Sequence, residues 1–342
     1  MPSVQMLFGT VSGLEKIVSG ELSDKLDAKK LLLFPYGSQG WIRCEIERSH
    51  LEDVRSLRSI VEAHIVLHEE EYGLGFSIDR FADMTVKTIP DYAPRARKIS
   101  VSAYSVRGKP SQRHIQGAFS RRIVEKLNAE SNFKDYDTAV RITLLKSIAV
   151  ATINLEIQPG NLSKEILIHP TPLLPPIAYC MVRLCSPKSG ELLLDPMCGY
   201  GTILMMAALE WKNLEIVGAD LEQENILCAR KNAEALGLQN KTRFLVSDIA
   251  QLATKGIKAD IIAVNPPYDM TLPSKKEVDK LYRILFEEAS LILSSRGRMV
   301  TVTPYPEIVV QEATRQKFKI VSVCRIQERD SPRSIHLLRR TE

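Results

Sequence analysis

From about residue 190 to the end of the chain, short apolar segments alternate with longer segments of helical spacing. The apolar segments read ELLLDP, EIVGAD, TRFLVSD, ADIIAVNPPY and RMVTVTP, and the helical segments include TILMMAALEW, QENILCARKNAEALG and KLYRILFEEASLIL. Strands that alternate with helices predict a mostly parallel sheet covered by helices on both faces. The last two segments, KIVSVCRIQ and SIHLLRR, have no helix between them, so we expect them to form an antiparallel hairpin.

Four of these strands end on a polar side chain. The four residues are Asp195, Asp220, Asp248 and Asn265. In a doubly wound sheet, ligands bind at the carboxyl ends of the strands, so one crevice should collect all four. The first strand leads into the loop DPMCGYGT, in which Gly199 and Gly201 let the backbone approach a ligand closely at a helix start.

This loop differs from the GxGxxG pattern of dinucleotide sites, and Asp195 stands where a pyrophosphate would meet a negative charge. The carboxylate favours a ligand with a cationic end, such as the ammonium of a methionine moiety. Asp220 lies where an acidic residue binds ribose hydroxyls, and Asp248 can accept from the amino group of an adenine. An ammonium, a ribose and an adenine together describe S-adenosylmethionine. The alternative is three ordinary strand-end caps, since aspartate favours such positions.

The fourth strand ends in the segment NPPY, which is Asn265, Pro266, Pro267 and Tyr268. The side-chain oxygen of Asn265 and the carbonyl of Pro266 could accept both hydrogens of an amino group on a nucleobase, and the prolines would fix the carbonyl direction. Tyr268 could stack on that base, which would be flipped out of its helix. Positioning for in-line displacement at the sulfonium methyl would then carry most of the rate. The alternative is a strand that ends in a Pro-Pro turn.

The first half of the chain has an α+β pattern. Residues 1–72 read as βαββα, with the second helix over residues 50–71. Residues 73–158 begin with a helix that Pro90 and Pro94 should break, and end in two strands joined by a hairpin at residues 145–147. A proline-rich connector over 159–177 then leads to the strand and helix repeat of 178–342. We therefore expect two small N-terminal domains, a stiff connector and a larger C-terminal domain.

Basic residues are concentrated in one part of this chain. Residues 84–128 contain ten Lys and Arg against two Asp and Glu, whereas residues 1–83 contain nine against fourteen. Such clustering is typical of a polyphosphate partner, although a solvated helix face gives the same pattern. The candidate RNA-binding residues are Arg95, Arg97, Lys98, Arg107, Lys109, Arg113, Arg121 and Arg122.

Other features limit the class of protein. No apolar run approaches the roughly 18 residues that a membrane span needs. The start of the chain has no secretory signal pattern, and the six cysteines are scattered without spacing suited to zinc. We expect a reduced, cytoplasmic protein without a metal, present as a monomer or a weak dimer.

The motifs resemble those of class I S-adenosylmethionine-dependent methyltransferases that act on amino groups. Their signature has the form [DN]PP[YFW], and their first loop often reads DPxCGxGT, which residues 195–202 match. Residues 98–127 and 134–155 look like parts of a THUMP domain preceded by a ferredoxin-like domain. The resemblance implies an α/β protein: a C-terminal Rossmann-like methyltransferase domain with a seven-stranded sheet, plus N-terminal α+β ferredoxin-like and THUMP domains.

The chain is most similar to the THUMP-containing tRNA (guanine-N2-)-methyltransferases that act on guanine 6 of the acceptor stem. The resemblance implies that the N-terminal domains hold the 3′ CCA end and that NPPY binds the target guanine. Relatives that dimethylate guanine 10 generally have DPPY instead. The resemblance also implies a set of residues that contact S-adenosylmethionine. These are His169, Pro172, Leu173, Asp195, Pro196, Met197, Cys198, Gly199, Tyr200, Gly201, Thr202, Asp220, Leu221, Asp248, Ile249 and Asn265. Asp269 departs from the family, where glycine is common, and affects the expected shape of the base pocket.

Several other functions stay open at this point. A guanine-10 tRNA methyltransferase is one alternative. NPPY also serves DNA adenine methyltransferases and protein glutamine methyltransferases. The basic segment disfavours a protein substrate. A non-catalytic RNA-binding protein is disfavoured by the complete set of motifs, and a nicotinamide-dependent oxidoreductase by the absence of GxGxxG.

Overall fold

The computed structural model describes residues 3–106, 108, 110–157, 166–170, 172–267, 274–328 and 331–341. The contacts within the chain divide it into two compact units. The first unit comprises Met1–Gly9, Ser19–Ser56 and Val61–Gln158, and the second comprises Thr10–Val18, Leu57–Ile60 and Pro159–Glu342. The domain boundaries expected at residues 72, 158 and 177 stay predictions.

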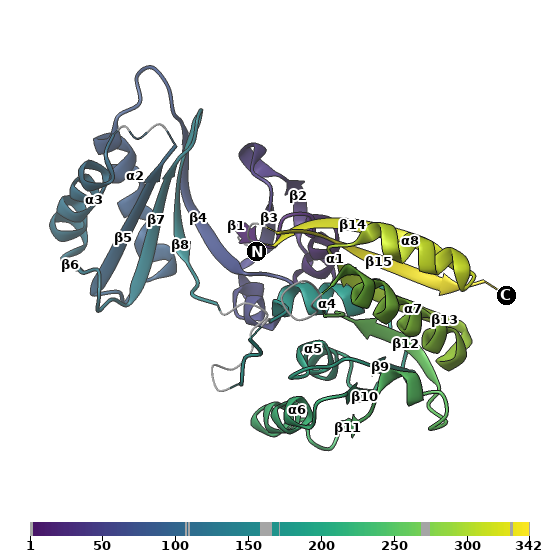
Figure 1. The fold of residues 1–342 in the computed structure, drawn as a ribbon. Helices are drawn as coiled ribbons and strands as arrows, with labels where there is room; N and C mark the ends of the chain where they lie inside the picture. Colours follow the sequence, from purple (N-terminus) through teal and green to yellow (C-terminus); the bar gives the residue numbers. More distant parts are fainter. Residues whose placement is uncertain are drawn as a thin grey trace. The chain divides into compact units, whose positions relative to one another are not determined.

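The N-terminal half contains eight strands and three helices among the described residues (Figure 1). In chain order they are β1 (Ser3–Gly9), α1 (Glu15–Leu26), β2 (Lys29–Leu33), β3 (Trp41–Glu47), β4 (Glu62–Glu71), α2 (Ile78–Tyr92), β5 (Lys98–Ser105), α3 (Gln112–Leu127), β6 (Glu130–Ser131), β7 (Thr138–Leu144) and β8 (Ile148–Asn154). The strands form one sheet in the order β2-β3-β1-β4-β8-β7-β5-β6. The sheet therefore runs continuously across residue 72.

The helix expected over residues 50–71 is wrong, because β4 occupies residues 62–71. This strand pairs antiparallel with β1 on one edge and with β8 on the other. Its apolar residues Ala63 and Ile65 are buried in the sheet. Pairing on both edges outweighs the local helical pattern, because strand preference depends mostly on neighbouring strands.

Helices α2 and α3 pack side by side over β4 and β5, with Phe81 of α2 against Phe119 of α3 (Figure 1). Helix α2 runs through Pro90 and ends at Tyr92, so the expectation that Pro90 breaks this helix is wrong. Pro90 lies in the last turn, where the missing N–H removes only one bond of a helix that is already ending. The hairpin expected at residues 145–147 is confirmed: β7 and β8 pair antiparallel, and the Leu145 N–H donates to the Ile148 carbonyl at 2.9 Å.

The second unit contains the sheet of the strand and helix repeat. Its elements are α4 (Pro175–Leu184), β9 (Leu192–Asp195), α5 (Thr202–Glu210), β10 (Glu215–Asp220), α6 (Gln223–Ala235), β11 (Thr242–Val246), β12 (Ala259–Val264), α7 (Lys275–Ile292), β13 (Leu293–Thr303), α8 (Pro306–Arg315), β14 (Phe318–Glu328) and β15 (Ser331–Arg340). The strand order is β11-β10-β9-β12-β13-β15-β14. Strands β9 to β13 are parallel, and β14 and β15 form an antiparallel hairpin. The predicted mostly parallel seven-stranded sheet with a terminal hairpin is confirmed.

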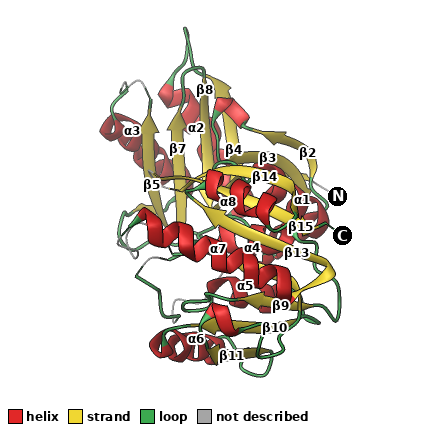
Figure 2. Cartoon of the chain, turned by 45° about the vertical axis from the view of Figure 1, so that its right-hand side comes forward, coloured by secondary structure: helices red, strands yellow, loops and turns green. Residues whose placement is uncertain are grey.

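Helices cover both faces of this sheet. One face packs against α7 and α8, which lie in front of β13 and β15 in Figure 2, in a core that includes Val217 and Ala219 of β10. Gly218 lies between these two residues and faces the opposite side, where an added Cβ would come within 2.4 Å of Leu204 of α5. Because side chains alternate along a strand, β10 serves both cores, and a glycine lets α5 approach closely.

A short N-terminal segment belongs to this second unit. Ser12 forms an isolated antiparallel bridge with Gln327 of β14. Gly13 has a φ of +98°, and an added Cβ would lie 1.9 Å from the carbonyl oxygen of Arg325. Only a residue without a side chain can make this approach.

Candidate active site at the carboxyl ends of the strands

The loop after β9 is shaped by two glycines in the left-handed region, with φ of +51° at Gly199 and +84° at Gly201. The loop is held to the next strand by the Cys198 N–H, which donates to the Ala219 carbonyl at 2.9 Å. The Gly201 N–H donates to the Cys198 carbonyl at 2.8 Å, and Gly201 then caps the start of α5. The sequence Gly-Tyr-Gly therefore folds the backbone back over the end of the sheet.

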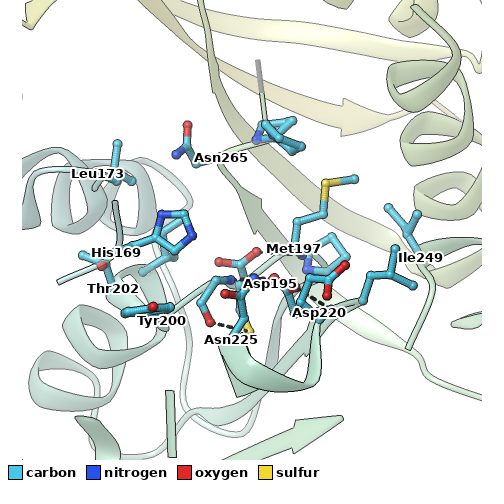
Figure 3. Close-up of a pocket in the computed structure, with 18 of the residues that line it drawn as sticks. His169, Leu173, Asp195, Met197, Tyr200, Thr202, Asp220, Asn225, Ile249 and Asn265 are labelled. Carbon is cyan, nitrogen blue, oxygen red and sulfur yellow. Dashed lines mark hydrogen bonds between the residues drawn. The ribbon is translucent and has the colours of Figure 1, made fainter. Parts of the chain in front are cut away.

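A cavity of about 470 Å³ lies at this end of the sheet, within the range typical of cofactor sites (Figure 3). Nearly all residues expected at the cofactor line it. They are His169, Leu173, Asp195, Pro196, Met197, Cys198, Gly199, Tyr200, Thr202, Asp220, Leu221, Asp248, Ile249 and Asn265. The expected base-binding residues Pro266 and Pro267 also line the cavity. Tyr268 and Asp269 lie outside the described residues.

Two of the expected cofactor residues, Pro172 and Gly201, are not among those that line the cavity. Gly201 instead faces the helices. An added Cβ there would meet the Met205 side chain at 3.2 Å and the Ala229 side chain at 3.4 Å. Its role in the structure is therefore to turn the chain and to let α5 and α6 approach each other.

Asp195 is a buried acid at the floor of the cavity, with 2% of its surface exposed. The Met197 N–H donates to its Oδ1 at 3.1 Å. Burial raises the pKa of Asp195 well above its usual range, the nearby Asp220 raises it further, and the Met197 hydrogen bond opposes both effects. A cationic group in the cavity would favour the ionised form, so this carboxyl suits an ammonium ligand.

Asp220 is already engaged by the protein. The Gly199 N–H donates to its Oδ2 at 2.8 Å, and its Oδ1 accepts from the Glu222 N–H at 3.0 Å and from the Asn225 side chain at 2.9 Å. These bonds tie the glycine loop after β9 to the start of α6. Since a carboxylate has about four acceptor positions, Asp220 retains about one for a ligand.

Apolar side chains line the same part of the cavity. Ile249 is buried and Leu221 is exposed, and both border the space beyond Asp220. Asp248 is exposed and accepts from the Ala250 N–H at 3.0 Å, which caps a short 3₁₀ turn. Ile249 and Leu221 could enclose an adenine, with Asp248 at the edge of that base.

Asn265 follows the last residue of β12 and carries the most unusual polar atom of the cavity. Its Oδ1 is buried, and no group of the described chain forms a hydrogen bond with it. In Figure 3, Asn265 lies at the upper edge of the cavity, apart from Asp220 and Ile249. A buried acceptor without a donor costs about 1 to 3 kcal/mol, which an N–H of a ligand would offset.

Burial raises the pKa of the Cys198 thiol well above its usual range, and Asp195 and Asp220 add to the effect. The thiol is therefore neutral and unsuited to nucleophilic chemistry. Within the described chain there is no group of three or more His, Cys, Asp or Glu side chains that could hold a metal ion. The described helices include none that is both long and apolar enough to cross a membrane.

Several residues that line the cavity were not predicted from the sequence: Ile203, Glu222, Asn225, Ser247 and Leu281. Ile203 directly follows the loop 195–202, Glu222 and Asn225 lie shortly after Asp220, and Ser247 precedes Asp248, so extending each motif by a few residues would have found them. Leu281 lies one and a half turns into α7 and has no local signal that distinguishes it from a core residue.

The candidate RNA-binding residues have different environments. Arg122 pairs with Asp79 at 2.9 Å and with Asp83 at 3.1 Å, and Lys98 pairs with Asp135. Arg121 lies 3.9 Å from Asp79. Arg95, Arg97 and Arg113 are exposed, and Arg107 and Lys109 lie outside the described residues. Part of the basic excess is therefore neutralised by acids of α2, which precede residue 84 in the chain.

The fold of the second unit, with its central parallel strands, terminal hairpin and strand-end cavity, is that of the class I methyltransferases. Consistent with this fold, the sequence profile of the family described as "RMKL-like, methyltransferase domain" matches residues 165–330. The crystal structure of TrmN from Thermus thermophilus has a TM-score of 0.85 and 20% identity, and covers 99% of this chain and 100% of TrmN. At this identity the likeness shows a shared fold.

Two curated relatives are similar over part of their length. The U6 snRNA (guanine-N(2))-methyltransferase THUMPD2 of Mus musculus is 29% identical over 161 residues, which are 47% of this chain and 30% of the relative. The tRNA (guanine(6)-N2)-methyltransferase of Methanocaldococcus jannaschii is 24% identical over 235 residues, 57% of this chain and 62% of the relative. The chain thus spans less than two thirds of each of these relatives.

Proposed function

We propose that this chain is an S-adenosylmethionine-dependent methyltransferase that modifies the N2 amino group of a guanine in tRNA. The observation that carries the proposal is the buried Oδ1 of Asn265, which has no partner in the described chain and borders the same cavity as Asp195. The Asn265 oxygen suits an amino group that receives a methyl. The buried Asp195 suits the ammonium of the methyl donor. The names of the two relatives support a guanine N2 target.

S-adenosylmethionine would supply a methyl group on a positively charged sulfur. The Asp195 carboxylate would hold the ammonium, Asp220 a ribose hydroxyl, and Leu221 and Ile249 the faces of the adenine. Asn265 Oδ1 and the Pro266 carbonyl would accept from the two hydrogens of the guanine amino group and direct its nitrogen to the methyl. The new N–C bond would form as the S–C bond breaks, and one proton would pass from nitrogen to water. Tyr268 is proposed to stack on the flipped base.

The proposal extends to guanine 6 of the acceptor stem, with the N-terminal ferredoxin-like and THUMP domains holding the 3′ CCA end. Its support is the Asn at position 265, the THUMP-like sequence pattern, and the name of the tRNA relative. A cytoplasmic monomer or weak dimer is part of the same proposal. Light scattering after size-exclusion chromatography tests the oligomeric state.

Methylation of U6 snRNA is the second candidate function. It is favoured by the similarity to the U6 snRNA enzyme, and this similarity covers 47% of this chain. Both candidates place the methyl on the same guanine nitrogen, so they share one site and differ in the RNA. The substrate assay must therefore include both RNAs.

The experiment uses the purified full chain with methyl-labelled S-adenosylmethionine and, in parallel, unmodified tRNA, U6 snRNA, duplex DNA and a protein extract. Nucleoside mass spectrometry identifies the product, and cleavage mapping identifies the nucleotide. We expect N2-methylguanosine in tRNA at position 6. N6-methyladenine in DNA, methylglutamine in protein, or no transfer to any substrate would contradict the proposal, and dimethylguanosine at position 10 would correct its finer part.

Asn265→Ala tests the assigned acceptor. Removing one preorganised hydrogen-bond partner of the reacting group should lower kcat by about 10²- to 10³-fold, while the affinity for S-adenosylmethionine stays close to that of the wild type. Asn240→Ala is the matched control, because Asn240 is an exposed asparagine of the same unit and does not line the cavity. Turnover of Asn265→Ala equal to that of the control would show that the amino group is held elsewhere.

A further inference from the structure

A buried asparagine outside the cavity connects two segments that form its wall. Asn232 lies on α6, is 4% exposed, and is not among the residues that line the cavity. Its Nδ2 donates to the Leu167 carbonyl and to the Tyr200 carbonyl, each at 3.0 Å, and its Oδ1 accepts from the Leu167 N–H at 2.7 Å. Both N–H donors of the Asn232 amide are thus used, and the backbone of Leu167 is held at its N–H and at its carbonyl.

The segment 166–170 depends on these bonds because the side chains of Leu167 and Ile168 anchor it weakly. Leu167 is 41% exposed and Ile168 is 71% exposed, although both are large and apolar. Buried side chains would fix these two residues by apolar packing, whereas Leu167 and Ile168 offer mainly their backbone. The Asn232 amide therefore supplies a large part of what fixes this segment to α6.

The fixed segment carries His169 into the wall of the cavity. The His169 ring lies edge-on to the Tyr200 ring, with centroids 4.9 Å apart and an interplanar angle of 85°. His169 also lies over the glycine loop, since a Cβ added at Gly199 would be 3.6 Å from its Cδ2 (Figure 3). Asn232 is bonded to the residue two positions before His169 and to the carbonyl of Tyr200 itself. One amide therefore sets the spacing between the two sides of this wall.

We infer that Asn232 is a positioning residue that joins the connector segment 166–170 to the glycine loop and thereby preorganises the cofactor wall formed by His169 and Tyr200. The inference rests on the proposed function, because it concerns the affinity of that cavity for S-adenosylmethionine. An asparagine is required by the geometry: two carbonyl oxygens face Nδ2 and one N–H faces Oδ1. Aspartate has the same shape but would place an oxygen against two carbonyls.

The test compares Asn232→Ala and Asn232→Asp with the wild type in three measurements. Calorimetry should give an affinity for S-adenosylmethionine about tenfold weaker in both variants, as expected from the loss of such a hydrogen-bond set, with the affinity for tRNA unchanged. Hydrogen exchange should show that the Leu167 amide loses protection in Asn232→Ala without any ligand present, whereas aspartate keeps the oxygen that accepts from this amide. Thermal unfolding reports the general loss of stability. The isosteric aspartate removes the two hydrogen bonds that Nδ2 donates while keeping the volume of the side chain.

Asp260→Ala is the matched control. Asp260 likewise joins backbone and side-chain groups of two segments, accepting from the Leu192 N–H at 3.1 Å and from the Ser294 hydroxyl at 2.9 Å, but it lies at the opposite end of the sheet. This control should lose stability while keeping both the cofactor affinity and the protection of Leu167.

The outcomes separate the inference from the proposed function. Wild-type cofactor affinity in Asn232→Asp, or a loss of affinity equal to that of the Asp260 control, would overturn the positioning role. An unchanged exchange rate at Leu167 in Asn232→Ala would overturn the anchoring itself. A wild-type chain that does not bind S-adenosylmethionine would overturn the proposed function, and the exchange data would then decide the anchoring independently.

Discussion

A substitution at Asp195 can separate two effects of this carboxylate: the loss of stability caused by burying its charge, and its contribution to ligand affinity. The change Asp195→Asn keeps the shape of the side chain and an oxygen that accepts from the Met197 N–H, but removes the ionisable group. Since the carboxyl is 2% exposed and burial raises its pKa, its ionised form is unfavourable when no cation is bound. The same ionised form is the one that an ammonium ligand needs. Stability and affinity should therefore respond in opposite directions.

The sign of the stability effect follows from linkage. A group whose pKa is raised in the folded state contributes stability that is fully present below its unfolded pKa and is lost as the pH rises through the folded pKa. At pH 7 to 8 the wild type should have lost part of this contribution, whereas the asparagine variant has no group to ionise. If Asp195→Asn raises the free energy of unfolding by about 1 kcal/mol, the ligand-free variant should melt about 2 to 4 °C higher than the wild type. The difference should vanish towards acidic pH.

The affinity effect is larger and opposite. A hydrogen bond between charged groups contributes about 1.5 to 3 kcal/mol, so Asp195→Asn should bind S-adenosylmethionine roughly 10- to 150-fold more weakly. Thermal unfolding with and without the cofactor, followed across pH, and calorimetry at pH 7.5 measure both effects. Asp260→Asn serves as the control, with lower stability expected and unchanged affinity. A ligand-free Asp195→Asn variant that melts lower than the wild type at pH 7 to 8, with unchanged cofactor affinity, would refute the reasoning.

Two further predictions concern strand β10 and helix α3. Gly218→Ala should lower the free energy of unfolding by about 1 to 3 kcal/mol, because the new methyl would lie 2.4 Å from the Leu204 side chain. Chemical denaturation measures this loss. An unchanged denaturation midpoint would mean that α5 moves freely to accommodate the methyl. Arg113→Glu should make the slope of log affinity for tRNA against log salt concentration shallower, by the amount that about one phosphate contact or more contributes. Arg122→Glu should instead act mainly on stability, because Arg122 pairs with Asp83. Equal effects of the two reversals on the salt slope would show that the ion pair opens on binding.

The parallel sheet was predictable because its signal is local and repeated. Each strand from β9 to β12 contains a short apolar run, as does the second half of β13, and each of the polar strand ends could be read directly. The cavity residues could be predicted for the same reason, since parallel strands end at one edge. Their placement around one cavity is observed, and their individual roles stay predictions.

The features that could not be predicted from the sequence have a non-local cause. The segment 62–71 forms a strand because β1 and β8 pair with its two edges, and β8 lies about 80 residues further along the chain. Arg122 is neutralised by Asp79 and Asp83, which the packing of α2 against α3 brings to it. Asn232 contacts a residue 65 positions away. No periodicity or local motif reports such contacts.

Asp195 and Asp220 show where residue type stops being informative. Both end a parallel strand, both are buried, and both border the cavity. Asp220 accepts three hydrogen bonds from the protein, so most of its acceptor capacity holds the glycine loop and α6 in place. Asp195 accepts from Met197 and has a pKa that burial raises, so its charge becomes favourable mainly when a cation arrives. A change at Asp220 should therefore disturb the shape of the site before any ligand binds, whereas a change at Asp195 should leave the shape intact and remove the preference for the ligand.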